Sequence, residues 1–128
     1  MPGKDEVSYT KTHEWVFIEG DNATIGISDH AQREMGDVVF VELPKIAQNL
    51  EKEKPCAVVE SVKSAFDIYA AVTGEVTAIN DKLEDDPALI NTSPLEEGWM
   101  YKIKLTNSDE LNDLMDFTAY QEFVKESA

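Results

Sequence analysis

Short runs of β-branched and aromatic residues, separated by turn residues, occupy most of the first 105 positions of this 128-residue chain. Residues 15–19 and 23–27 are two such runs, and Gly20, Asp21 and Asn22 between them are residue types that favour a hairpin turn. Several runs are apolar on both faces, as expected for strands inside a sandwich. The pattern predicts a mostly β fold built from two antiparallel sheets.

Five further strands are expected from the same pattern, at residues 37–43, 54–61, 65–72, 74–79 and 100–105. A short helix should follow the first hairpin over residues 29–35, because Ser28 suits its N-cap and Gly36 its end. Between residues 81 and 99 the chain is polar and rich in turn residues, which indicates irregular structure.

Two helices are expected after the last strand. Asn107 and Glu110 have capping-box spacing, and Asp116 can cap a second helix with Tyr120 and Phe123 on its apolar stripe. The stripe would cover the core of the sandwich. We therefore expect one domain over residues 1–128, with an N-terminal arm at 1–12, a β sandwich at 13–105 and C-terminal helices at 107–125.

Lys63 lies between two predicted strands, on a tip of small residues with no carboxylate within two positions. A lysine on such a tip is open to another protein and is a candidate for covalent attachment. Most hairpin-tip lysines are simply solvated, so the position alone leaves both interpretations open.

The chain carries 26 acidic and 11 basic residues, a formal net charge of −15. A field of this sign repels nucleic acids and anionic lipid surfaces, so we expect neither as a partner. The acidic side chains either serve only to solvate the surface or also steer basic partner proteins toward it, and both interpretations remain open. No apolar run has membrane-spanning length and the first residues show no targeting pattern, so we expect a cytoplasmic protein, or a mitochondrial matrix protein lacking its transit peptide.

Catalytic machinery is hard to find in the sequence. His13 and His30 lie apart from each other and from Cys56, so no metal site is expected. No glycine-rich phosphate loop and no nucleophile elbow occur. The single cysteine lies in an apolar strand pattern and is expected to act as a small hydrophobe in a reducing compartment. We expect no catalytic residues.

The chain resembles the H protein family of the glycine cleavage system over nearly its full length. The resemblance rests on segments in the family's order: Thr12-His13-Glu14-Trp15-Val16, residues 23–32, residues 36–44, Glu60-Ser61-Val62-Lys63, Gly74-Glu75-Val76 and Gly98-Trp99-Met100. Together these segments are far more specific than any one of them.

The resemblance implies a lipoyl-domain-like barrel-sandwich hybrid with the modified lysine at a hairpin tip. It implies lipoate in amide linkage on Lys63, within an attachment motif formed with Glu60, Ser61, Val62 and Ser64. It also implies a carrier, not an enzyme, which moves the aminomethyl group of glycine. Within the carrier, Thr12, Glu14 and Asp67 are the residues that we expect to hold the protonated amine.

The same resemblance implies four kinds of partner: a pyridoxal-phosphate glycine decarboxylase, a tetrahydrofolate-dependent aminomethyltransferase, dihydrolipoamide dehydrogenase and lipoate-attaching enzymes. We expect a monomer, because no large apolar stripe demands a dimer. Three alternatives stay open at this stage: a lipoyl or biotinyl domain of an acyltransferase or carboxylase, whose usual triplets around the lysine are absent, an unmodified acidic adaptor and a hydrolase.

Some positions depart from the family pattern. Ala47 and Glu53 stand where the family usually has glycine. If these positions require positive φ, each substitution costs about 1 kcal/mol; otherwise the loop takes another path. Ser64 replaces alanine, Ala71 replaces proline and Leu95 replaces tyrosine.

Overall fold

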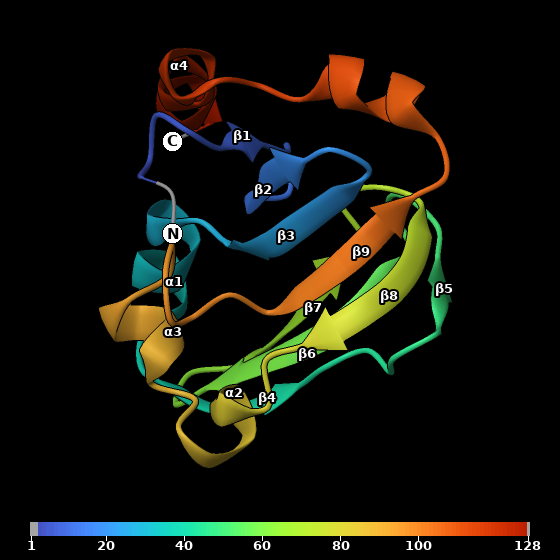
Figure 1. Ribbon diagram of the computed structural model, residues 1–128. Helices are drawn as coiled ribbons and strands as arrows, with labels where there is room; N and C mark the ends of the chain where they lie inside the picture. Colours follow the sequence, from blue (N-terminus) through green and yellow to red (C-terminus); the bar gives the residue numbers. More distant parts are fainter. Residues whose placement is uncertain (1–2, 128) are drawn as a thin grey trace.

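The computed structural model describes residues 3–127, so Met1, Pro2 and Ala128, the ends of the predicted domain, lie outside the described residues. The described part contains two antiparallel sheets (Figure 1). The larger has the order β1 (Ser8–Tyr9), β2 (Glu14–Glu19), β3 (Asn22–Ile27), β9 (Tyr101–Leu105), β8 (Gly74–Ile79) and β5 (Asn49–Leu50). The smaller has the order β4 (Val38–Glu42), β6 (Pro55–Ser61) and β7 (Ala65–Tyr69).

The predicted class, mostly β with two antiparallel sheets, is confirmed, and the described strands do not close into a barrel. All the predicted strands are present, some with trimmed ends; the strand expected to continue to residue 72 ends at Tyr69. Strands β1 and β5 were missed because two residues are too few to show a period.

Helix α1 (Asp29–Met35) begins and ends where predicted. The Ser28 hydroxyl accepts a hydrogen bond from the Ala31 N–H at 3.1 Å, and Gly36 ends the helix at φ 82°. Helices α2 (Lys82–Asp85) and α3 (Leu89–Thr92) lie where irregular structure was predicted. Each has one turn and is anchored by a fully buried residue, Leu83 or Ile90.

Of the two C-terminal helices, the first is a 3₁₀ helix, η1 (Ser108–Asp113), and the second is α4 (Phe117–Ser127). The Asn107 side chain caps the first, but Glu110 does not complete the predicted capping box. Its carboxylate instead accepts hydrogen bonds from the Thr73 N–H at 2.7 Å and hydroxyl at 2.8 Å. Asp116 caps α4 as predicted, through the Ala119 N–H at 2.8 Å.

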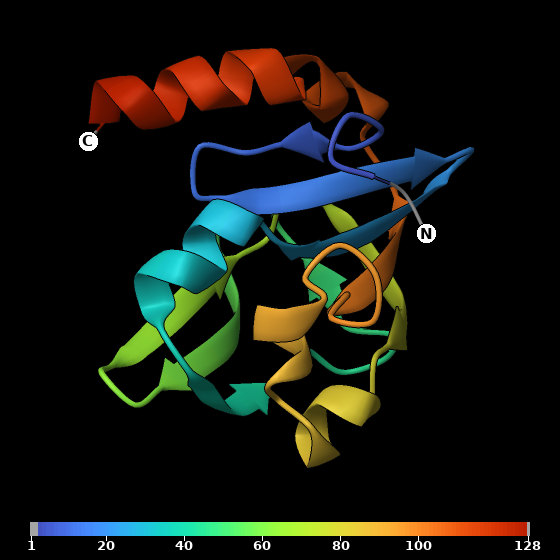
Figure 2. The same ribbon diagram turned by 90° about the vertical axis from the view of Figure 1, so that its left-hand side faces the viewer.

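Two apolar layers flank the larger sheet. The first fills the space between the sheets, and the second lies between the larger sheet and α4, which crosses β1 and β2 on their outer side (Figure 2). Strand β2 supplies both, because Val16 faces the first and Trp15 the second. Trp15 is fully buried and packs so closely on Gly26 that a Cβ there would lie 2.6 Å from its ring.

The loops before and after β5 hold two residues in the left-handed region. Ala47 has φ 73° and Glu53 has φ 71°. The Cβ of an L-residue is crowded in this region, and glycine is not. The chain therefore keeps a path that suits glycine at both positions and accepts the local strain.

We expect Ala47→Gly and Glu53→Gly each to raise the free energy of unfolding by about 1 kcal/mol, because glycine adopts these angles without the Cβ clash. Urea denaturation measures the change. Glu51→Gly is the control, since Glu51 lies two residues from Glu53 without positive φ, and glycine there should lower stability. A loss of stability in all three variants would contradict the account.

Candidate functional site

The β6–β7 hairpin places Lys63 at its tip, which projects beside α1 (Figure 2). Ser61 closes the tip. Its hydroxyl oxygen accepts hydrogen bonds from the Lys63 N–H at 3.1 Å and the Ser64 N–H at 3.3 Å, and its own N–H donates to the Ser64 carbonyl at 2.8 Å. The Ser61 side chain is thus the element that shapes the turn around the lysine.

The Lys63 side chain lies against the end of α1. Its Nζ donates a hydrogen bond to the Glu34 carbonyl at 2.8 Å, where helix carbonyls carry partial negative charge. Its Cε lies 3.6 Å from the place that a Cβ on Gly36 would occupy. Glycine at the helix end therefore leaves the stem of the lysine free of side-chain contact at this point.

A cleft of about 470 Å³ opens beside this amine, between α1 and β7. We call it the α1–β7 cleft. Glu34, whose carbonyl accepts the hydrogen bond from Lys63, also lines the cleft, so the lysine and the cleft share this residue. The polar lining is Thr12, His13, His30, Glu34 and Asp67, and the apolar lining is Ile27, Ala31, Met35, Phe66, Ile68 and Val124.

Of the three residues predicted to hold an amine, Thr12 and Asp67 line the cleft and Glu14 does not. Glu14 is only 1% exposed. Its Oε1 accepts hydrogen bonds from the Thr10 hydroxyl at 2.7 Å and the Thr12 hydroxyl at 2.5 Å. Burial raises the pKa of Glu14, opposed by the bonds from the threonines and the Tyr69 N–H. Thr12 therefore stands between this carboxylate and the cleft.

His13 and His30, expected to lie apart, are brought together by the fold. Their ring centroids are 5.1 Å apart, because β2 begins beside the first turn of α1. His13 Nδ1 lies 2.7 Å from the Tyr120 hydroxyl, which lies 2.7 Å from the Ser28 hydroxyl. In either tautomer of His13, Tyr120 can satisfy both partners, because a hydroxyl donates once and accepts. Burial, and secondarily His30, lower the pKa of His13.

Sequence reasoning missed three polar residues of the cleft, His13, His30 and Glu34, and the contact of His13 with Tyr120. A signal existed for His30 and Glu34, since residues four apart share one face of the predicted helix. None existed for the pairing of His13 with Tyr120, which are separated by 107 positions.

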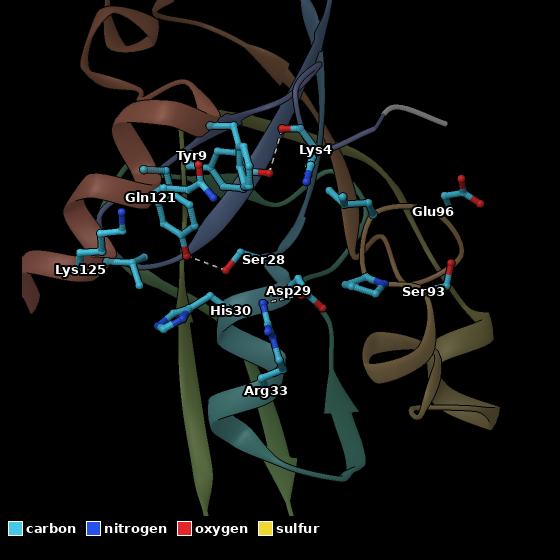
Figure 3. A pocket seen from close by; sticks show the side chains of 15 residues that line it. Lys4, Tyr9, Ser28, Asp29, His30, Arg33, Ser93, Glu96, Gln121 and Lys125 are labelled. Atoms are coloured by element: carbon cyan, nitrogen blue, oxygen red, sulfur yellow. Dashed lines mark hydrogen bonds and ion pairs between the residues drawn. The ribbon is translucent and has the colours of Figure 1, made fainter. Parts of the chain in front are cut away.

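A second pocket, of about 590 Å³, adjoins the cleft and shares His30 and Val124 with it. Figure 3 shows Lys4, Arg33 and Lys125 among its lining side chains. These cations already have partners: Arg33 pairs with Asp29 at 2.7 Å, Lys4 lies over the Phe117 ring at 4.9 Å and Lys125 lies 4.0 Å from Glu122. No tip residue lines this pocket. No tip residue lines the α1–β7 cleft either, but Glu34 does, and its carbonyl is the hydrogen-bond partner of Lys63.

Other chemistry has little support within residues 3–127. No group of three metal-ligating side chains comes together there. The Cys56 thiol lies 3.8 Å from the Tyr101 hydroxyl, and burial raises its pKa to about 11, so the reactive thiolate is scarce at neutral pH. In the same part of the chain, every helix is too short or too polar to cross a bilayer.

The chain has clear relatives among known proteins. A family model described as Glycine cleavage H-protein matches residues 7–127. The glycine cleavage system H protein of Methylacidiphilum infernorum is 52% identical over 118 residues, 92% of each chain. That of Thermotoga maritima is 50% identical over 115 residues, 90% of this chain and 93% of the relative. The crystal structure of an H protein from Mycobacterium marinum matches with a TM-score of 0.84 at 32% identity, covering 99% of this chain and 98% of that one.

We expect Tyr120→Phe to lower the free energy of unfolding by about 1–3 kcal/mol, because His13 and Ser28 both lose a partly buried hydrogen-bond partner. Urea denaturation measures the loss. Tyr9→Phe is the matched control: its ring stacks on Tyr120 at 4.4 Å, and its hydroxyl makes one bond, to the Lys4 carbonyl. A loss no larger than that of the control would contradict the role of Tyr120.

Proposed function

Because the chain belongs to the glycine cleavage H-protein family, we propose that it is the lipoyl carrier of that system and bears lipoate in amide linkage on Lys63. The observation that supports the assignment to Lys63 is the hydrogen bond from its amine to Glu34, a residue that also lines the α1–β7 cleft. The family is a carrier component of the system and not itself a catalyst.

The site has the features that a lipoyl arm requires. Lys63 is exposed on a turn that Ser61 holds in shape, and its stem passes beside Gly36. The cleft combines apolar side chains with the carboxylates of Glu34 from α1 and Asp67 from β7. When attached, lipoate supplies a disulfide that accepts the one-carbon amine fragment of glycine at the end of a flexible arm.

Thr12, Glu14 and Asp67 are proposed to hold the protonated amine of the cargo. Asp67 lines the cleft as an exposed carboxylate, and Thr12 offers its hydroxyl oxygen. Glu14 supplies negative charge from behind Thr12, where burial strengthens its field. Water is excluded on the apolar side by Phe66 and Ile68, which protects a cargo prone to hydrolysis.

Membership of the system implies its other enzymes as partners. We propose four in particular: a pyridoxal-phosphate glycine decarboxylase, a tetrahydrofolate-dependent aminomethyltransferase, dihydrolipoamide dehydrogenase and lipoate-attaching enzymes. Glu60, Ser61, Val62 and Ser64 form the proposed recognition motif for attachment around Lys63. We further propose one monomeric domain over residues 1–128, in the cytoplasm or the mitochondrial matrix.

The attachment is tested by intact-mass analysis of the chain purified from its own cell. We expect a lipoyl adduct that maps to the peptide containing Lys63 and disappears in Lys63→Ala. The control Lys54→Ala removes a lysine just before the start of β6, at the end away from the tip, and should retain the adduct. A native chain without an adduct, in cells that lipoylate other proteins, would overturn the assignment.

The cleft residues are tested by the lifetime of the cargo on the lipoylated chain, followed by mass. Glu14→Gln keeps an acceptor oxygen for the two threonines and removes the charge, and Asp67→Asn removes the charge at the cleft edge. Each should shorten the lifetime about tenfold, the effect of losing about 1.4 kcal/mol of charge-assisted bonding. Lipoylation should be unchanged.

Glu75→Gln is the control for net charge, because Glu75 is exposed on β8 and is not among the residues lining the cleft. It should leave the lifetime unchanged. If the lifetime is also unchanged in both cleft variants, the carboxylates have no part in holding the cargo.

A further inference from the structure

Three of the four strongly exposed large apolar side chains of the described surface come from β4 and from the tip of the β6–β7 hairpin, which carries Lys63. Val62 is 68% exposed, Val39 54% and Phe40 50%, while the fourth, Ile46, lies in the loop after β4. We call Val39, Phe40 and Val62 the apolar collar. Exposed apolar residues scattered singly need no explanation, but a group at one place indicates contact with another molecule.

Backbone pairing of β4 with β6 builds the collar. Phe40 lies opposite Glu60 and Val38 opposite Ser61, and the register shift between them leaves Val39 as an extra residue on β4. A bulge on an edge strand turns side chains outward. The Val62 N–H donates to the Asp37 carbonyl at 3.0 Å and joins the tip to the start of the same strand. The collar is therefore fixed relative to Lys63.

Acidic side chains border the collar. Asp37 precedes β4, Glu42 ends it, and Glu60 lies opposite Phe40; all three are exposed. A surface that combines an apolar centre with an acidic border fits a partner with an apolar recess and basic side chains around it.

We propose that the apolar collar is the docking surface for the lipoate-attaching enzyme. This inference rests on the proposed function of Lys63, which requires such an enzyme. Before modification, the reacting atom is Nζ itself, held at the Glu34 carbonyl, so an enzyme must contact the tip to reach it. Enzymes that use the finished arm react at its dithiolane end and not at Nζ. The attachment step therefore depends on contact with residues beside Lys63 more than the later steps do.

The step itself requires an activated lipoyl carbonyl, such as an acyl–adenylate, supplied by that enzyme. The Nζ–C bond forms and the acyl C–O bond breaks. The nucleotide leaves through its phosphate oxygen, which keeps the electron pair of the broken bond. Nζ starts as an ammonium and loses two protons in all. Docking on the collar draws the amine from the Glu34 carbonyl toward the donor.

The experiment compares unmodified full-length chain with the double variant Phe40→Ser and Val62→Ser and with the control Ile46→Ser. Ile46 is 61% exposed, between Phe40 at 50% and Val62 at 68%, but lies outside the collar. With purified lipoate-attaching enzyme, lipoate and ATP, mass analysis gives kcat/KM, and calorimetry gives the Kd of the unmodified chain for the enzyme. Acetylation of Lys63 by a small anhydride reports whether the tip is intact.

We expect the double variant to lose at least tenfold in both kcat/KM and affinity, with Ile46→Ser and the acetylation rate unchanged. Unchanged lipoylation, or an equal loss in Ile46→Ser, would overturn the proposal. Slower glycine turnover with normal lipoylation would assign the collar to another enzyme of the system and would also overturn it. Wild-type chain that never gains an adduct on Lys63 would instead refute the proposed function.

Discussion

Hydrogen bonds at both ends of α1 determine the geometry of the site. At its start, Ser28 caps the helix and also bonds the Tyr120 hydroxyl, which ties α4 to the sandwich. At its end, the Glu34 carbonyl accepts a hydrogen bond from Lys63, whose stem passes beside Gly36. A seven-residue helix has little stability of its own, so these contacts, with the packing of Ala31 and Met35, keep it in place.

Strand β2 is buried on both faces and carries one buried carboxylate, Glu14, which its hydrogen bonds stabilise. Val16 and Trp15 fill the two apolar layers, and Glu14 takes the position at the end of the inter-sheet layer. Two threonine hydroxyls and a backbone N–H bond its carboxylate, and no buried side-chain nitrogen or oxygen within the described residues lacks a partner. A satisfied carboxylate of this kind retains its field toward the cleft without leaving an orphaned charge.

Local rules accounted for the parts of the fold that are built locally. The cap and stop of α1, the β2–β3 hairpin and the Asp116 cap each depend on a few adjacent residues, and all were correctly predicted. The capping box predicted for Glu110 was wrong because the carboxylate accepts hydrogen bonds from a distant residue, Thr73, instead. The meeting of His13 with His30 depends on packing between β2 and α1, which has no period in the sequence. Positive φ at Ala47 and Glu53 was foreseen only as one of two alternatives.

The claim that the arm and its cargo occupy the α1–β7 cleft is tested most directly by backbone amide chemical shifts. Spectra of the unmodified, lipoylated and cargo-loaded chain would be compared under one set of conditions. The account predicts that loading shifts the amides of Thr12, Phe66 and Asp67, with little change at Lys4 and Gln121 in the neighbouring pocket. Shifts confined to Lys4 and Gln121, or no shift beyond the tip, would contradict it.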